Sequence, residues 1–306
     1  MRRKLTPRQF YRLLHRVADR NISPVTSAYM RTIKAMQQRV NPELLRRAIE
    51  ARDPRAVADA MGVDSVFRRA FITEVAPALR RPFVSAAVLT ERSMPQLNLR
   101  LDLTNPRALS WATNRSAQLV TEITRDVKLG IRRFVAQSFR EGKTTKWLST
   151  TLRRSEIIGL HSRQIDALGN FRDKLAARVD AGKITQAFAD SQADRYQERL
   201  LRQRARTIAR TETIRASSEG QNELWQQGLD DGTFDAEITR RVWIVTPDDR
   251  TCEICLSVAE MNPEGVPIGQ PYQSIDGPVD QPPAHPNCRC AEGLEFVLPA
   301  EYQVAA

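Results

Sequence analysis

The sequence predicts a mainly α-helical protein, with long helices in its N-terminal and central parts and a small, turn-rich α+β module at its C-terminus. The first observation is proline: eight lie between Pro7 and Pro106, none follows until Pro247, and nine occupy the remainder up to Pro299. Because proline disrupts helix interiors, so long a gap favours long helices. The second is charge. From Trp243 onward the chain carries ten acidic residues and two arginines, a net charge of −8, which leaves +19 for the preceding part of a chain whose total is +11.

The third observation is apolar periodicity, which predicts the individual elements. In the N-terminal part, Phe10, Leu13, Leu14 and Val17 mark one helix face. A second helix is predicted to start at Ser23-Pro24 and a third at Pro42-Glu43. Two further helices are predicted over residues 65–75 and 82–92.

The central part has the clearest helix signals. Thr104-Asn105-Pro106 predicts the start of a long helix that runs to about residue 139. A loop and another helix follow up to residue 155, then short helices interrupted by Gly169 and Gly182. Residues 190–228 predict the clearest long helix, and 240–246 alternate apolar and other residues as a strand does.

These signals suggest three consecutive domains. Residues 1–140 form a helical region of unknown role, 141–241 a basic helical domain, and 242–306 a small acidic Cys/His module. No apolar run approaches the roughly 18 residues that a membrane helix needs. The charged start of the chain lacks the apolar core of a signal peptide. We therefore expect no membrane association and a cytoplasm in which thiols stay reduced.

All four cysteines lie beside one histidine in the acidic module. Cys252 and Cys255 form one Cys-x-x-Cys pair, and His285 and Cys288 repeat that spacing, with Cys290 two residues further on. Two such pairs predict a zinc site of tetrahedral type. We favour Cys252, Cys255, His285 and Cys288 as ligands, with Cys290 as the substitute, so that one of the last two cysteines is left out. The metal would be structural, because a small acidic module has few core residues of its own.

Other interpretations of the cluster stay open. Two disulfides or free thiols are possible, although nothing in the sequence suggests secretion and the cysteines are tightly grouped. A catalytic metal would need a general base, for which Asp248, Asp249 or His285 could serve. A zinc deaminase needs a His-x-Glu motif that neither His15 nor His161 provides.

An arginine stripe is the main candidate contact surface. The spacing four, three, four and four places five guanidinium groups on one helix face: Arg195, Arg199, Arg202, Arg206 and Arg210. The stripe has no interleaved aromatic residues, so base stacking is not expected. It is either a solvated face or a surface that contacts DNA phosphates, without sequence preference, or an acidic protein partner.

Three segments together resemble the phage Mu F-like family of head morphogenesis proteins, also called minor head proteins. They are "RARTIARTETIRASSEGQNELW", "RRVWIVTPDDRTCEIC" and "PPAHPNCRC", and the resemblance covers roughly residues 142–296. It implies a minor virion component that acts near the portal during head assembly and DNA packaging. The N-terminal third, up to about residue 140, has no such resemblance.

We therefore expect a non-enzymatic structural and assembly protein of a tailed-phage or prophage head. Its partners would be the portal protein or the inner capsid surface, with non-specific contact to the DNA backbone. It would reside in the virion, and in the bacterial host cytoplasm during assembly. The alternatives are a zinc-dependent nuclease or toxin-like effector, and a plain DNA-binding module.

Overall fold

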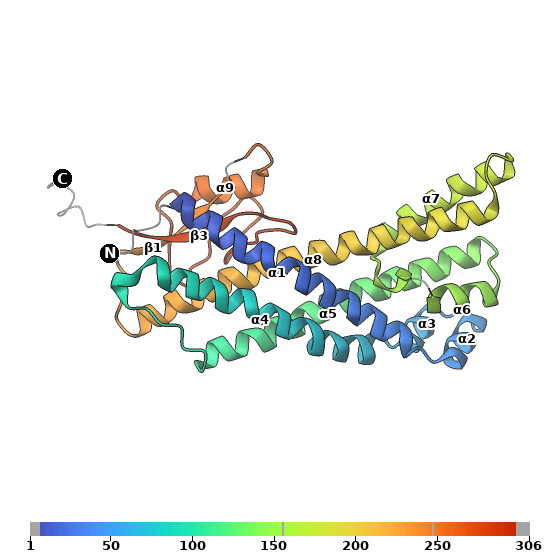
Figure 1. The fold of residues 1–306 in the computed structure, drawn as a ribbon, viewed down its shortest axis with the longest axis horizontal. Coiled ribbons are helices and arrows are strands. Elements are labelled where there is room, and N and C mark those ends of the chain that lie inside the picture. The colour runs from blue at the N-terminus through green and yellow to red at the C-terminus, as the bar shows by residue number, and fades with distance from the viewer. Residues whose placement is uncertain (1–6, 155, 247, 298–306) are drawn as a thin grey trace. The chain divides into compact units, whose positions relative to one another are not determined.

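The computed structural model describes residues 7–154, 156–246 and 248–297 (Figure 1). These residues form long helices and one small antiparallel sheet, which confirms the predicted mainly α-helical class. The α-helices are α1 (Pro7–Gln38), α2 (Pro42–Glu50), α3 (Pro54–Ala60), α4 (Arg68–Ser93), α5 (Pro106–Arg140), α6 (Thr145–Arg154), α7 (Ser162–Asp180), α8 (Gln186–Asp230) and α9 (Glu253–Met261). Short helical turns of other types are η1 (Val63–Phe67), η2 (Pro95–Leu97) and η3 (Glu156–Gly159). The strands are β1 (Thr239–Ile244), β2 (Val266–Pro267) and β3 (Ala291–Phe296). No helix in the described part of the chain is both long and apolar enough to cross a membrane.

The chain folds into two compact units built from interleaved segments. Unit 1 comprises residues 1–25, 78–113 and 207–306, and unit 2 comprises 26–77 and 114–206. Helices α1, α4, α5 and α8 each contribute residues to both units. The acidic module therefore shares a compact unit with helical segments that are far from it in sequence. The three consecutive domains stay a prediction.

The predicted helix start at Ser23-Pro24 is wrong, because α1 continues through it with Pro24 in its interior. A helix-interior proline loses one backbone hydrogen bond and crowds the preceding turn. In α1, however, the buried residues Leu14, Ala18, Val25 and Ala28 are spaced four, seven and three apart, so they lie on one helix face on both sides of the proline. Burial of one continuous apolar stripe outweighs the local cost of Pro24.

Other predictions of helix ends at proline or glycine are also wrong. The helices expected over 65–75 and 82–92 are largely one helix, α4, which contains Pro77 and Pro82. Gly169 does not interrupt α7. A Cβ atom added there would lie 2.2 Å from Nε2 of Gln137 on α5, so this glycine permits close packing of two helices rather than a turn. Gly182 does follow the end of α7, with a φ of +67° that favours glycine.

The other predicted helix starts agree with the structure. Asn41 caps α2 with its side chain and is followed by a proline at the first helical position, where the sequence predicts the start. Asp53-Pro54 begins α3 in the same way, but the sequence analysis did not predict this helix. Asn105 accepts the backbone N–H of Arg107 at 2.9 Å, at the start of α5. The predicted helix over 190–228 lies within α8.

Within unit 2, α7 and the first part of α8 form an antiparallel helical hairpin (Figure 1). Its core consists of Leu175, Ala189 and Ala193, with Phe171 and Val179 packed against them. The small alanine side chains on α8 allow the two helices to approach closely.

Within unit 1, the sheet has the order β2-β1-β3 with antiparallel neighbours. The predicted strand at 240–246 corresponds to β1, whose residues alternate between buried and half-buried positions. Trp243 of β1 packs edge-on against Tyr272 with 5.3 Å between ring centroids. Both rings belong to a buried cluster that also includes Cys255, Cys288 and Cys290. The cysteines are thus part of the hydrophobic core of the module.

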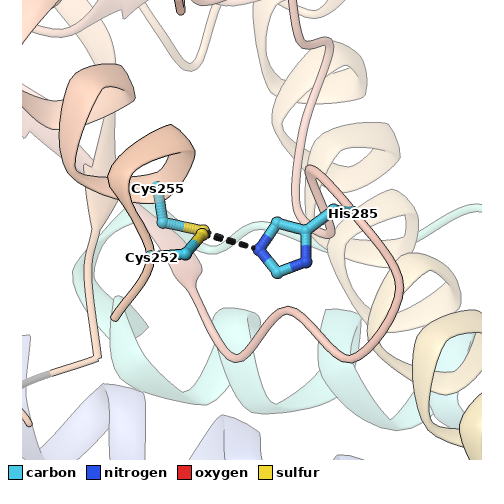
Figure 2. A group of neighbouring side chains, drawn as sticks. All are labelled: Cys252, Cys255 and His285. Atoms are coloured by element: carbon cyan, nitrogen blue, oxygen red, sulfur yellow. Dashed lines mark hydrogen bonds between the residues drawn. The ribbon is translucent and has the colours of Figure 1, made fainter. Parts of the chain in front are cut away.

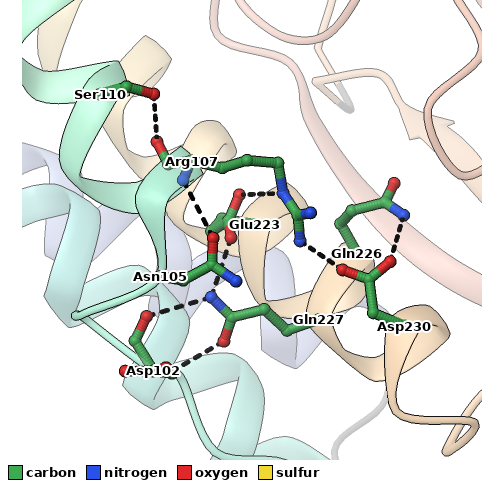
Figure 3. Close-up of polar contacts among 8 residues, drawn as sticks. All are labelled: Asp102, Asn105, Arg107, Ser110, Glu223, Gln226, Gln227 and Asp230. Atoms are coloured by element: carbon green, nitrogen blue, oxygen red, sulfur yellow. Dashed lines mark hydrogen bonds and ion pairs between the residues drawn. The ribbon is translucent and has the colours of Figure 1, made fainter.

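Hydrogen bonds and ion pairs join the start of α5 to the end of α8 within unit 1 (Figure 3). The guanidinium of Arg107 donates to Glu223 at 3.3 Å and to Asp230 at 2.6 Å. The side chain of Gln227 exchanges two hydrogen bonds with the backbone of Asp102, at 2.8 and 3.1 Å. These contacts fix the segment of α8 that precedes the sheet.

Candidate metal centre

The five Cys and His side chains predicted from the sequence meet at one place in unit 1. Two triads have ligand atoms within 4.8 Å of one another: Cys252, Cys255 and His285 in one, and Cys255, Cys288 and Cys290 in the other. Cys255 belongs to both triads. Figure 2 shows the first, with both thiols directed toward the imidazole ring. This arrangement can hold a metal ion.

Local structure explains how these side chains converge. Cys252 occupies the cap position of α9 and Cys255 lies in its first turn, so both thiols project from one helix end. The sequence predicted a tight turn here and missed α9. Cys288 and Cys290 lie in the loop that leads directly into β3, and both are buried. Alternate residues of an extended segment point the same way, and these two cysteines do so.

The distances suit a tetrahedral ion with small adjustments. The Sγ atoms of Cys255 and Cys288 are 3.6 Å apart. Ligands about 2.3 Å from one zinc ion lie roughly 3.8 Å from each other at tetrahedral angles. Nε2 of His285 lies 3.0 Å from Sγ of Cys252 and 3.2 Å from Sγ of Cys255. These separations are shorter, so binding would widen the first triad by about 0.5 Å.

The surroundings of His285 favour the tautomer that a metal ligand requires. Its Nδ1 lies 2.9 Å from the carbonyl oxygen of Pro286. A carbonyl only accepts hydrogen bonds, so this contact favours the tautomer with the proton on Nδ1, in which Nε2 keeps a lone pair. That lone pair faces the two thiols of α9, and the Pro286 carbonyl acts as the outer partner that orients metal-binding histidines.

The four cysteines are free thiols, not disulfides. The 3.6 Å between Cys255 and Cys288 is well beyond the roughly 2.05 Å of a disulfide bond. Hydrogen bonds from the Cys255 and Cys290 thiols hold the pKa of Cys288 well below its usual range. The same interaction with Cys288 raises the pKa of Cys255. One thiolate is therefore favoured in this group, and the thiolate is the form that binds metals.

The loop that carries His285 and Cys288 is anchored to α8. Asn287, at its tip, has a φ of +62°. Its backbone N–H donates to Oγ1 of Thr211 at 3.1 Å, and its side-chain amide lies 3.5 Å from Oγ1 of Thr207. Two threonines one helical turn apart therefore hold the loop.

Further contacts fix the residue between the two buried cysteines. The guanidinium of Arg289 binds both carboxylate oxygens of Asp248, one of them at 2.8 Å. Its carbonyl oxygen accepts hydrogen bonds from Thr246 at 2.9 Å and from Tyr11 of α1 at 3.0 Å. The sequence analysis did not identify Tyr11, because no local signal links it to a residue 278 positions away.

The ion pair between Arg289 and Asp248 affects whether Asp248 could act as a general base. Hydrogen bonds from Arg289, and secondarily from Arg250, lower the pKa of Asp248 well below its usual range. A carboxylate with so low a pKa is a weak general base. Asp248 therefore does not suit the role that a zinc-dependent hydrolase would require of it.

A buried polar network lies on the same face of β1 as Trp243, and its Arg241 lies over the ring of Tyr272 at 5.0 Å. Arg241 and Glu292 form an ion pair at 3.1 Å with side-chain exposures of 4% and 0%. Asn222 of α8 donates to Glu292 at 2.6 Å and accepts from Arg241 at 3.1 Å. Burial raises the pKa of Glu292 to about 7, against the opposing effect of Arg241. The sequence analysis did not identify this network, because its charges lie on elements remote in sequence.

The arginine stripe is divided between solvent and protein. Arg195, Arg199, Arg202 and Arg206 are exposed, whereas Arg210 is half-buried. Arg202 pairs with Glu198 at 2.6 Å. Arg199 lies over the ring of Tyr196 at 5.0 Å, so the expectation that no aromatic residue lies among these arginines is wrong. The fully buried arginine of this segment is Arg204, which lies outside the predicted stripe.

Comparison with known families identifies one family. The model of the family described as Phage Mu protein F like protein matches residues 130–292, more than half of the chain. The matched range includes Thr211, Trp243 and all five Cys and His residues of the centre. No curated protein and no solved structure matches the chain. The resemblance in the sequence is thereby confirmed, and the chain belongs to the phage Mu protein F-like family.

Proposed function

We propose that this protein is a minor head protein of a tailed phage or prophage, with a structural, non-enzymatic role in head assembly near the portal. Membership of the phage Mu F-like family carries the proposal. The match spans both the threonine-bearing segment of α8 and the loop that this segment anchors, so the matched motifs form one structural unit. The protein would reside in the virion, and in the bacterial cytoplasm before heads are complete.

The test is capture of the portal protein. The full chain would be co-expressed with the portal protein encoded beside it, and the complex isolated through a tag on either partner. A stable complex, together with detection of the chain in purified heads by mass spectrometry, is expected. Absence of the chain from purified heads would contradict the proposal.

The centre in unit 1 would hold one structural zinc ion. Cys252, Cys255 and His285 supply three ligands, and Cys288 the fourth, with Cys290 as its substitute. The donor set and the Nε2 lone pair of His285 support zinc over magnesium or calcium, which prefer oxygen ligands. Elemental analysis of protein purified without added metal should give about one zinc per chain. Four oxidised cysteines without metal would contradict this.

The exposed arginines of α8 would contact DNA phosphates or an acidic partner surface. Arg195, Arg199 and Arg206 are exposed and have no ion pair within the described residues. If they meet duplex DNA, replacing all three with glutamine should flatten the log–log salt dependence of binding by roughly two to three units. Unchanged salt dependence would indicate a solvated or protein-facing stripe.

The enzymatic alternative is a zinc-dependent nuclease. Purified protein should leave supercoiled and linear DNA intact when zinc, magnesium or manganese is added. Metal-dependent cleavage that disappears in a folded His285→Ala variant would replace the structural role with the catalytic one.

A further inference from the structure

A second basic feature lies in unit 2, away from the arginine stripe. A cavity of about 690 Å³ is lined by three arginines, Arg55 of α3 and Arg132 and Arg133 of α5, and by a single acidic residue, Asp53. On α5 the two arginines share a face with Leu129 and Ala136, which line the same cavity at helical spacing. The adjacent pair Arg132-Arg133 is visible in the sequence but was not assigned a role there.

The positive charge in this cavity is only partly compensated. Arg133 forms an ion pair with Asp166 at the surface. The carboxylate of Asp53 is engaged at the start of α3, where it accepts the backbone N–H of Arg55 at 2.7 Å. The side chains of Arg55 and Arg132 have no ion pair or hydrogen bond within the described residues. Two guanidinium groups therefore keep their donors for another acceptor.

Arg132 gives the strongest indication. Its Nε is buried and has no hydrogen-bond acceptor in the part of the chain that the structure describes. A buried donor of a charged group without a partner is unfavourable. The terminal nitrogens of Arg132, which are not buried in this way, are the donors that an acceptor in the cavity can reach, and guanidinium groups prefer acceptors with two or more oxygens.

The start of α7 supplies further donors beside the arginines. Ser162, its first residue, lines the cavity. His161 caps the helix through Nδ1, which accepts the N–H of Gln164 at 3.4 Å. The N–H groups of Ser162 and Arg163 precede that residue and have no acceptor within the helix. Their partial positive charge adds to that of the arginines.

We propose that this cavity binds phosphate groups, with the backbone of duplex DNA as their principal source. Arginine forks and free N–H groups at a helix start both suit phosphate oxygens. A phosphodiester chain also brings several charges in succession, which three arginines on two helices can meet. The net charge of +19 outside the acidic module favours such a polyanion over an isolated acidic side chain of a protein.

The proposal deepens the proposed function by adding a DNA contact, and it can fail separately from it. Binding to pure DNA does not depend on the portal protein or on head assembly. It is also separate from the arginine stripe, because the residues lie on different helices and can be replaced independently.

The test compares two full-length variants that lose the same kind of charge. Arg55→Gln/Arg132→Gln removes the unpaired guanidinium groups. The matched control is Arg178→Gln with Arg47→Gln, two exposed arginines that do not line the cavity. Affinity for a 20-base-pair duplex is measured over a salt series, and binding of inorganic phosphate by calorimetry. Circular dichroism checks that each variant keeps its helicity. The single variant Arg55→Gln, which changes only an exposed side chain, repeats the binding measurements.

The cavity variant should flatten the log–log salt dependence by about two units and the single Arg55 variant by about one, while the control leaves it unchanged. Loss of inorganic phosphate binding with an unchanged DNA slope would support the phosphate site but identify free phosphate as its source. The proposal is overturned if neither ligand responds to the cavity variant. A polyglutamate peptide is tested in the same way. The proposal is also overturned if the cavity variant loses binding to this peptide but keeps its binding to DNA and phosphate, a result that would assign the cavity to an acidic protein.

Discussion

The backbone N–H of Asn287 donates to the hydroxyl of Thr211, at 3.1 Å, and so joins the Cys/His loop to α8. Thr211 in turn donates to the carbonyl oxygen of Thr207 one turn earlier, at 2.8 Å. A single hydroxyl thus accepts from the loop and donates to its own helix. This link gives a physical reason why a helical segment and a distant Cys/His loop occur together in the family motif.

Replacing Thr211 with valine should destabilise the protein and weaken metal binding. The N–H of Asn287 would lose its acceptor; because Asn287 is exposed, water replaces that acceptor in part, and we expect a cost of about 0.5–1.5 kcal/mol. Urea unfolding and zinc competition with a chelator measure the two effects. The control is Thr121→Val on α5, whose exposed hydroxyl bonds only to the carbonyl of Ala117. Its effect should stay within about 0.5 kcal/mol, and equal losses in both variants would contradict the anchoring role.

The choice between Cys288 and Cys290 as a ligand can be decided by serine substitution. If Cys288 is the fourth ligand, Cys288→Ser should lose most bound zinc and unfold at lower temperature. Cys290→Ser should retain about one zinc per chain, because serine then replaces only a packed thiol. Removal of metal from the wild-type protein by a chelator should reproduce the instability of Cys288→Ser. The reverse pattern would make Cys290 the ligand.

The local signals in the sequence identified helices and the metal-binding residues well. The predicted starts at Pro42 and Pro106 each begin a helix in the structure, directly after the capping residues Asn41 and Asn105. The Cys-x-x-Cys and His-x-x-Cys spacings also identified groups that the fold brings together. Both kinds of signal depend on residues a few positions apart, so a single segment contains all of the information.

The features that the sequence analysis predicted wrongly or missed have one cause in common: they depend on tertiary packing. Pro24 lies inside α1 because a continuous buried stripe runs past it. Gly169 lies inside α7, and its lack of a Cβ atom lets the side-chain amide of Gln137 on α5 pack against the helix. The contact between Tyr11 and Arg289, and the ion pair between Arg241 and Glu292, join elements that no sequence period relates.

Glu219 should make stability fall as pH rises. Burial is the main cause that raises the pKa of this α8 carboxyl above its ordinary value near 4.5, and the neighbouring Glu223 adds to the effect. The folded state therefore holds the proton more tightly than the unfolded chain. Its contribution to stability is complete below the unfolded pKa and is lost as pH rises through the folded pKa.

Glu219→Gln should remove that contribution to the pH dependence. Glutamine keeps an oxygen that can accept the hydrogen bond from Gln281, which is 2.6 Å long in the wild type. The difference in unfolding free energy between variant and wild type, measured by urea from pH 5 to 8, isolates Glu219, because the metal-binding thiols titrate in both proteins. The variant should gain relative stability with rising pH. A constant difference would contradict the prediction.

Gly220 on α8 should tolerate no side chain, since it marks the closest approach of two helices in unit 1. A Cβ atom there would lie 2.0 Å from the carbonyl oxygen of Phe83 on α4. Alanine normally favours a helix interior by roughly 0.5–1 kcal/mol over glycine, but here α4 and α8 would have to separate. Because the contact is with backbone, no side-chain rotation relieves it, and we expect a net loss of about 2–4 kcal/mol in unfolding free energy.

Gly182→Ala is the control, because nothing lies within 4 Å of its added Cβ and only its φ of +67° opposes the change. That variant should lose about 1 kcal/mol. If Gly220→Ala were as stable as Gly182→Ala, the two helices would not pack as closely as the structure places them.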